Sequence, residues 1–240
     1  MGKRIIQRAR GHGGPVYRVR KKAFVYEIGF PSMMNGNEAE IIELVHSRAH
    51  TAPLARLRIH NKNGVTQTFY APAFEGAYTG QKIAFDMEGR KAMGDIVKVG
   101  ILQPGDKLYN VERNPGDRGK LLRAAGAHAV VVRTSKGKVY IRTPSKKEVI
   151  LSENCLAQIG IPAGAGRLEK PVMKAGKMHH IKKAKSKLWP RTSAVKMNAI
   201  DHPFGSGRGK RIKSKIAKRN APAGARVGHL RPRRTGRTKR

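Results

Sequence analysis

Apolar and cationic residues alternate in one short stretch of the chain, where Ala55, Leu57 and Ile59 are interleaved with Arg56 and Arg58. This period of two predicts a β-strand with one apolar face and one cationic face. The turn-forming run Asn-Lys-Asn-Gly follows, and it predicts a hairpin whose second strand comes directly after it. Short apolar segments then recur roughly every ten residues, a spacing that favours an all-β barrel or sandwich.

The remaining apolar segments predict two sets of strands, each forming a small barrel. A proline and two glycines over residues 114–120 interrupt the pattern and predict the boundary between the sets. Residues 39–45 fit either a strand or a helix, because their apolar positions suit both periods. The other predicted strands are residues 54–59, 66–70, 82–86, 96–102, 107–111, 129–134, 139–143, 149–151 and 155–161.

Charge is concentrated at the two ends of the chain. Residues 1–36 carry 8 basic and 1 acidic residue, residues 37–160 carry 19 and 12, and residues 161–240 carry 24 and 2. The ends also have few apolar residues, so we expect arms that are extended or disordered until they lie along phosphates, with a solvated tail as the alternative. A short, marginal basic helix is predicted over residues 174–188.

The predicted organisation therefore has four parts. They are a basic N-terminal arm (1–36), a first barrel (37–113), a second barrel with a basic helix (114–188), and a basic extension rich in glycine and proline (189–240).

The whole chain has 51 basic and 15 acidic residues, a formal net charge of +36, and a sequence pI near 11.2. Such a chain repels itself unless a polyanion neutralises it. An acidic membrane would also need an amphipathic apolar face or a lipid anchor, and neither is found. No apolar run is long enough for a signal peptide or a membrane span, so we expect a cytoplasmic protein that binds nucleic acid.

The single cysteine, Cys155, excludes an intrachain disulfide and a multi-cysteine zinc site. We expect it to be a small buried side chain on a strand rather than a reactive thiol.

Residues 189–211 are not expected to form an apolar core. They contain the only tryptophan, a His-Pro-Phe step and a basic glycine-rich run. The run is not a nucleotide-binding loop, because Phe204 occupies the place of the first glycine and Arg211 follows the lysine. Glycines that allow close backbone approach, beside cations, suit a nucleic-acid backbone better. Trp189 fits a core position or a base-stacking position equally well.

Histidines raise the possibility of a metal or a catalytic site. His179 and His180 have no third ligand at a helical spacing, so we expect neither a metal nor a cofactor. A hydrolase triad of Ser193, His202 and Asp201 lacks the Gly-x-Ser-x-Gly elbow, so we expect no enzyme activity. Hydrogen bonds to phosphates or base edges, or stacking, are the expected role of the histidines.

The run from Trp189-Pro190 through 195–205 resembles the signature of the universal large-subunit ribosomal protein two family, the L-two family. The His-Pro-Phe-Gly form and the C-terminal run are similar to its archaeal and eukaryotic branch. Supporting similarities lie at residues 114–120, 163–171, 174–177, 219–222 and 233–237.

The resemblance implies an OB-fold barrel followed by an SH3-like barrel, with long basic extensions that thread into large-subunit ribosomal RNA. It also implies a place near the peptidyl transferase centre, roles in subunit association and tRNA binding, and contacts to neighbouring ribosomal proteins and the small subunit. Within the ribosome we expect a monomer. The alternative is a general DNA-compacting protein of the chromatin type.

Two departures from the family pattern limit this transfer. The family commonly has Arg-Gly where this chain has Ser193-Ala194, so that arginine contact is absent or moved to Arg191 or Lys196. Bacterial members have histidine where this chain has Phe204, so a catalytic imidazole argued for that position does not apply.

The expected RNA-binding residues are cations, histidines, the tryptophan and loop residues of the arms, with a few cations of the barrels. They are Arg4, Arg8, Arg10, Arg18, Arg20, Lys120, Arg123, Arg167, Lys174, Lys177, His179, His180, Lys182, Lys183, Trp189, Arg191, Lys196, Asn198, Asp201, His202, Gly205, Gly207, Arg208, Lys210, Arg211, Arg219, Arg226, Arg234 and Arg237.

Overall fold

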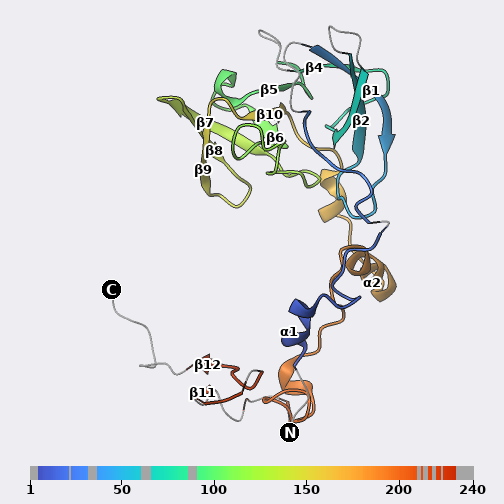
Figure 1. Cartoon of the computed structure of the whole chain (residues 1–240), viewed down its shortest axis with the longest axis vertical. Coiled ribbons are helices and arrows are strands. Elements are labelled where there is room, and N and C mark those ends of the chain that lie inside the picture. Colours follow the sequence, from blue (N-terminus) through green and yellow to red (C-terminus); the bar gives the residue numbers. More distant parts are fainter. Residues whose placement is uncertain are drawn as a thin grey trace. The chain divides into compact units, whose positions relative to one another are not determined.

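The computed structural model forms two compact units (Figure 1). We call residues 21–173 the β unit, and residues 1–20 together with 174–240 the basic unit. The structure describes residues 5–21, 23–31, 37–60, 66–85, 91–209, 212, 216–217, 220–222 and 224–230.

The β unit contains one ten-stranded sheet with the strand order β3-β2-β1-β4-β5-β10-β6-β7-β8-β9. All neighbouring strands pair antiparallel except β4 and β5, which pair parallel. The strands are β1 (Asn37–Val45), β2 (Leu54–His60), β3 (Thr66–Pro72), β4 (Lys82–Phe85), β5 (Ile96–Lys98), β6 (Lys107–Tyr109), β7 (Ala129–Ser135), β8 (Lys138–Arg142), β9 (Glu148–Ser152) and β10 (Leu156–Ile159).

The alternating stretch is a strand, as its pattern predicts. In β2, Leu57 and Ile59 are buried and Arg56 is half-buried, and the strand pairs with β3 in the predicted hairpin. The ambiguous segment 39–45 is also a strand, because β1 pairs with β2 on one side and with β4 on the other. Ala39 of β1 is fully buried in the core that these strands cover.

Two apolar cores lie in the β unit, and neighbouring residues of one strand belong to different cores. In β5, Ile96 packs in the first core and Val97 in the second; in β6, Leu108 packs in the second and Tyr109 in the first. Successive side chains of a strand point to opposite faces, so β5 and β6 serve both cores. The architecture is all-β, an OB-fold barrel followed by an SH3-like barrel.

Several strands are shorter than predicted. The predicted strand 96–102 ends at Lys98, and a 3-10 helix continues over Val99–Ile101. The last strand, β10, pairs with β5 and β6 and therefore joins the two halves of the sheet, whereas the sequence placed it in the second set alone. The domain bounds at residues 36, 113 and 188 remain a prediction.

The loop after β6 is held by two carboxylates. The backbone N–H groups of Arg113 and Asn114 donate to Asp117 over 2.9 and 3.1 Å. Glu112, whose side chain is almost fully buried, accepts hydrogen bonds from the N–H groups of Arg118 and Leu156, both over 2.9 Å. These bonds fix the Pro/Gly-rich loop against β10.

The basic unit has little regular structure in its described part. It contains helix α1 (Ile6–Ala9), helix α2 (Ala175–Ala184), and the short parallel strands β11 (Ile216–Ala217) and β12 (His229–Leu230). Helix α2 confirms the predicted basic helix at a shorter length, and none of its residues is buried. The helical turn of α1 differs from the extended arm that we expected; Ile5, which precedes it, is buried and lies near Gly224.

Candidate nucleic-acid interface

The two units differ sharply in charge. The basic unit has 28 Lys and Arg residues and one acidic residue, Asp201, whereas the β unit has 23 basic and 14 acidic residues. Cations at this density repel one another, and a bound polyanion removes that repulsion. The basic unit therefore carries the main candidate interface.

Helix α2 ends in a Schellman motif that places a serine in the left-handed conformation. The N–H of Ser186 donates to the Lys183 carbonyl over 3.2 Å, and the N–H of Lys187 donates to the Lys182 carbonyl over 2.9 Å. Ser186 has φ of 51°, a region that usually favours glycine. Its hydroxyl donates to the Arg18 carbonyl over 2.6 Å. One serine thus ends the helix and holds the N-terminal segment.

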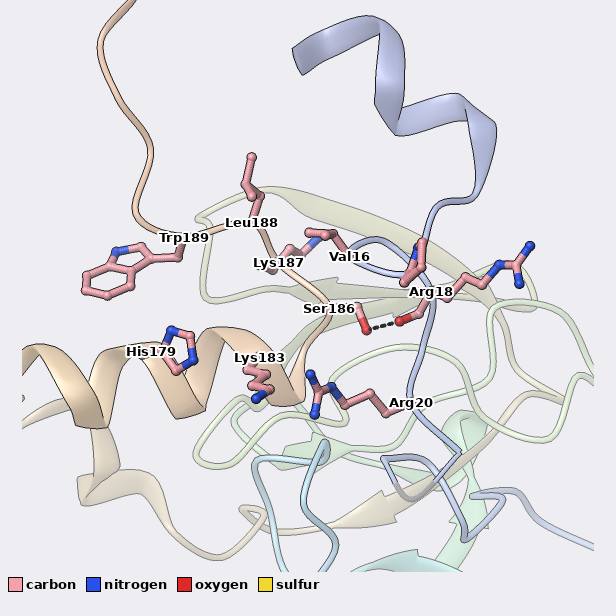
Figure 2. Close-up of a pocket in the computed structure, with 10 residues that line it drawn as sticks. Val16, Arg18, Arg20, His179, Lys183, Ser186, Lys187, Leu188 and Trp189 are labelled. Carbon is pink, nitrogen blue, oxygen red and sulfur yellow. Dashed lines mark hydrogen bonds between the residues drawn. The ribbon is translucent and has the colours of Figure 1, made fainter.

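A cavity of about 240 Å³ lies beside this hydrogen bond within the basic unit, and Ser186 and Arg18 are among the residues that line it (Figure 2). Apolar side chains, including Val16 and Leu188, line part of it. Five of the predicted RNA-binding residues also line it: Arg18, Arg20, His179, Lys183 and Trp189.

Trp189 is half-buried and belongs to neither core of the β unit. In Figure 2 its indole lies beside the His179 ring, while Arg20 and Lys183 lie close together elsewhere on the wall of the cavity. Of the two roles that the sequence left open, the position is that of a cavity wall rather than a core.

Residues 197–206 form a compact loop that closes on itself. The N–H of Gly205 donates to the His202 carbonyl over 2.8 Å, and the N–H of Ser206 donates to the Met197 carbonyl over 3.2 Å. A Cβ on Gly205 would overlap the backbone carbonyl of Asn198. Glycine is therefore required at this position by close packing.

His202 lies inside this loop, with its side chain only 5% exposed. Its Nδ1 accepts a hydrogen bond from the Phe204 N–H over 3.1 Å, which places any proton of the neutral ring on Nε2. Burial lowers the pKa of His202, so the neutral form is favoured. The Phe204 ring packs beside it, with ring centroids 5.0 Å apart. The structure gives His202 a positioning role in the loop.

The glycine-rich run after this loop turns through the left-handed region. Ser206, Gly207 and Gly209 have φ of 68°, 122° and 75°. The Lys196 side chain lies over Gly209, and with Arg208 it lines a second cavity of about 530 Å³. Backbone of this kind presents N–H groups together and suits an anion.

Three predicted residues lie in the β unit. Lys120 and Arg167 are exposed, whereas Arg123 is half-buried and burial lowers its pKa. Arg118, which the sequence did not single out, donates from Nε to the Phe30 carbonyl over 2.9 Å and from Nη1 to Glu27 over 3.3 Å. These contacts give Arg118 a structural role.

The other predicted residues are not gathered into either cavity, apart from Asn198 and Gly207, which line the second. Arg226 donates from Nε to the Ala221 carbonyl over 2.8 Å, and Asp201 is half-buried. Lys182 is half-buried, and the exposed ones are Arg8, Arg10, Lys174, Lys177, His180 and Arg191. Those outside the described residues are Arg4, Lys210, Arg211, Arg219, Arg234 and Arg237.

Sequence reasoning missed Ser186 and Lys187 as members of the interface. A serine two residues after a helix gives no sign of the conformation it adopts, and its partner Arg18 is 168 residues away along the chain. The one general indication is that a helix commonly ends with a residue in the left-handed conformation, which is the position that Ser186 occupies.

Within the described parts of the chain, no group of three His, Cys, Asp or Glu residues is arranged to hold a metal. No described helix is long and apolar enough to cross a membrane. Cys155 is fully buried in the second core, as expected, but it directly precedes β10 instead of lying on a strand. Burial raises the pKa of its thiol, which disfavours the reactive thiolate.

Comparison with known proteins decides the family. The family model described as Ribosomal Proteins L2, C-terminal domain, matches residues 92–224. The large ribosomal subunit protein uL2 of Hyperthermus butylicus is 41% identical over 242 residues and covers all of both chains. The chain belongs to this ribosomal protein family.

Further uL2 relatives support the assignment over the full chain. The uL2 protein of Desulfurococcus amylolyticus is 38% identical with complete coverage of both chains. The uL2 protein of Methanocorpusculum labreanum is 38% identical over 98% of this chain and 99% of its own. These archaeal sources agree with the branch that the His-Pro-Phe-Gly form indicated, and the chain is a structural protein of the large ribosomal subunit.

Proposed function

We propose that this uL2 family member binds large-subunit ribosomal RNA near the peptidyl transferase centre and supports subunit association and tRNA binding. The basic unit lies along RNA phosphates, and the β unit supplies the two apolar cores of the chain. The protein acts as one copy among neighbouring ribosomal proteins, in the cytoplasm, and it performs no catalysis of its own.

The separation of charge supports this proposal most strongly. The basic unit has 28 cations and one carboxylate, and its described part buries only Ile5 and Ala217 among apolar side chains. A segment with so little core gains its order from a partner, and RNA phosphates supply both the charge and the surface.

Salt dependence tests the proposal directly. We expect binding of the full chain to large-subunit RNA to weaken steeply with salt, by roughly 0.7 to 0.9 log units per log salt for each phosphate contacted. The measurement is a filter-binding or anisotropy titration at several potassium concentrations. Binding that does not change with salt would contradict the mechanism, and so would a protein that stays at the top of a gradient when cell extract is sedimented.

Replacement of His202 separates a structural role from a catalytic one. We expect His202→Ala to loosen the 197–206 loop and reduce assembly, because the Phe204 N–H loses its acceptor. In His202→Asn the amide oxygen takes the place of Nδ1, so assembly recovers although the imidazole is gone. Peptide transfer per assembled particle should equal that of the unmodified protein in both variants. Assembled His202→Asn particles that have lost most of their rate would show that the imidazole takes part in the chemistry.

A further inference from the structure

The cavity between the N-terminal segment and the end of α2 has the composition of a site for one nucleotide. It combines a flat aromatic wall, Trp189, with apolar contacts from Val16 and Leu188. A base needs this kind of surface, because stacking on an aromatic ring works for every base.

The charges around the same cavity fit a phosphate. Arg18, Arg20, Lys183 and Lys187 all line it, and none of the described residues that line it is acidic. Four cations around one small cavity repel one another until an anion enters. The cavity therefore offers an apolar, aromatic wall and a cationic wall, which match the two halves of a nucleotide.

We propose that this cavity binds one unstacked nucleotide of single-stranded RNA, with its base against the Trp189 indole and its phosphate on Arg20 and Lys183. A base inside a helix has both faces covered by its neighbours, so only a base that has left the stack can lie on the indole. This inference rests on the proposed function, since RNA is the polyanion that delivers the nucleotide.

The two walls come from distant parts of the chain, and Ser186 joins them. Its hydroxyl bonds the Arg18 carbonyl over 2.6 Å, while its own backbone has φ of 51°. A glycine at this position suits the backbone better but cannot make the bond. The serine therefore fixes the cationic N-terminal segment beside the tryptophan before RNA arrives.

The test uses the full chain and two labelled RNA probes of equal charge, a hexamer of adenylate and an abasic hexamer of ribose phosphate. We expect the adenylate hexamer to bind at least about fivefold more tightly, the low end of base stacking on an aromatic side chain. Trp189 is the only tryptophan, so its fluorescence should be quenched by the adenylate hexamer and not by the abasic one. Equal affinity of the two probes, without quenching, would overturn the proposal.

Two variants and a matched control locate the effect. Trp189→Leu should remove the preference for adenylate in an anisotropy assay while the affinity for the abasic probe stays the same. Ser186→Gly should reduce the preference with no loss of helical signal by circular dichroism. Tyr140→Leu removes an aromatic ring from the β unit, where it packs against Arg133, and should leave the preference intact. A preference that survives in Trp189→Leu would overturn the assignment of the base to the indole.

The remaining outcomes separate this proposal from the proposed function. Salt-dependent binding of ribosomal RNA together with equal affinity for both hexamers would reject the nucleotide site alone. Failure to bind any RNA would reject both. Adenosine monophosphate that binds as tightly as the hexamer would show a site for a free nucleotide and would overturn RNA as the source.

Discussion

The β unit and the basic unit use their acidic residues differently. Buried carboxylates of the β unit accept backbone hydrogen bonds, whereas the basic unit has one acidic residue, Asp201, against 28 Lys and Arg residues. Glu112 accepts three N–H groups, and Asp95 accepts those of Ala84 and Ala92, both over 2.7 Å. In the β unit, acidic side chains replace missing backbone partners and so contribute to the fold. In the basic unit, the described ionisable side chains are mostly exposed.

The same contrast holds for apolar side chains. The β unit has two cores of twelve or more buried residues, while helix α2 of the basic unit has no buried residue. Burial of apolar area is the main favourable term in folding, so the β unit is stable by its own contacts. If the basic unit binds RNA as proposed, neutralisation of its charge should stabilise it by mass action.

Truncation of one apolar side chain in each unit gives the largest expected difference. Ile141→Ala removes a fully buried side chain of the second core and should lower the free energy of unfolding by about 2–5 kcal/mol. Met178→Ala on the half-buried position of α2 should change it by less than about 0.5 kcal/mol. Chemical denaturation of the RNA-free protein measures both. Equal effects would mean that α2 shares in the cooperative core.

Removal of lysine charge should change RNA binding more in the basic unit than in the β unit. Lys177, Lys182 and Lys183 changed together to Gln should reduce the salt slope of RNA binding by roughly 0.7–0.9 for each phosphate that the variant no longer neutralises. The matched change of Lys136, Lys138 and Lys146 in the β unit should leave the slope unchanged. Titration of both triple variants over a range of salt concentrations compares them. An equal decrease of the slope in both would show that RNA binding is spread evenly over the chain.

Much of the β unit could be predicted from the sequence, because one-sided strands carry a period of two. The strand with Arg56 and Arg58 shows this pattern, and it was placed correctly. The sequence did not predict that β5 and β6 would contribute side chains to both cores. Ile96-Val97 and Leu108-Tyr109 are buried on both faces, and a strand of this kind is a continuous apolar run without alternation.

The candidate interface could be predicted in composition but not in geometry. The high density of Lys and Arg identified the arms as RNA-binding candidates, because segments with so few apolar residues cannot form a core of their own. The hydrogen bond from Ser186 to the Arg18 carbonyl joins the end of α2 to the N-terminal segment, and no local pattern connects residues so far apart. The need for Gly205 was also hidden, because it arises from contact with the Asn198 carbonyl rather than from a left-handed turn.

Acidification should produce the smallest effect, and it should be local to the basic unit. Burial lowers the pKa of His202 in the folded loop, so below about pH 6.5 the unfolded loop takes up a proton more readily than the folded one. The stability that the neutral ring contributes is present above that pH and is lost as the pH falls through the folded pKa. Amide NMR signals of Gly205 and Ser206, followed from pH 7.5 to pH 5, should move toward those of an open loop. In His202→Asn the same signals should stay constant, because the amide does not titrate; equal movement in both proteins would assign the change to another group.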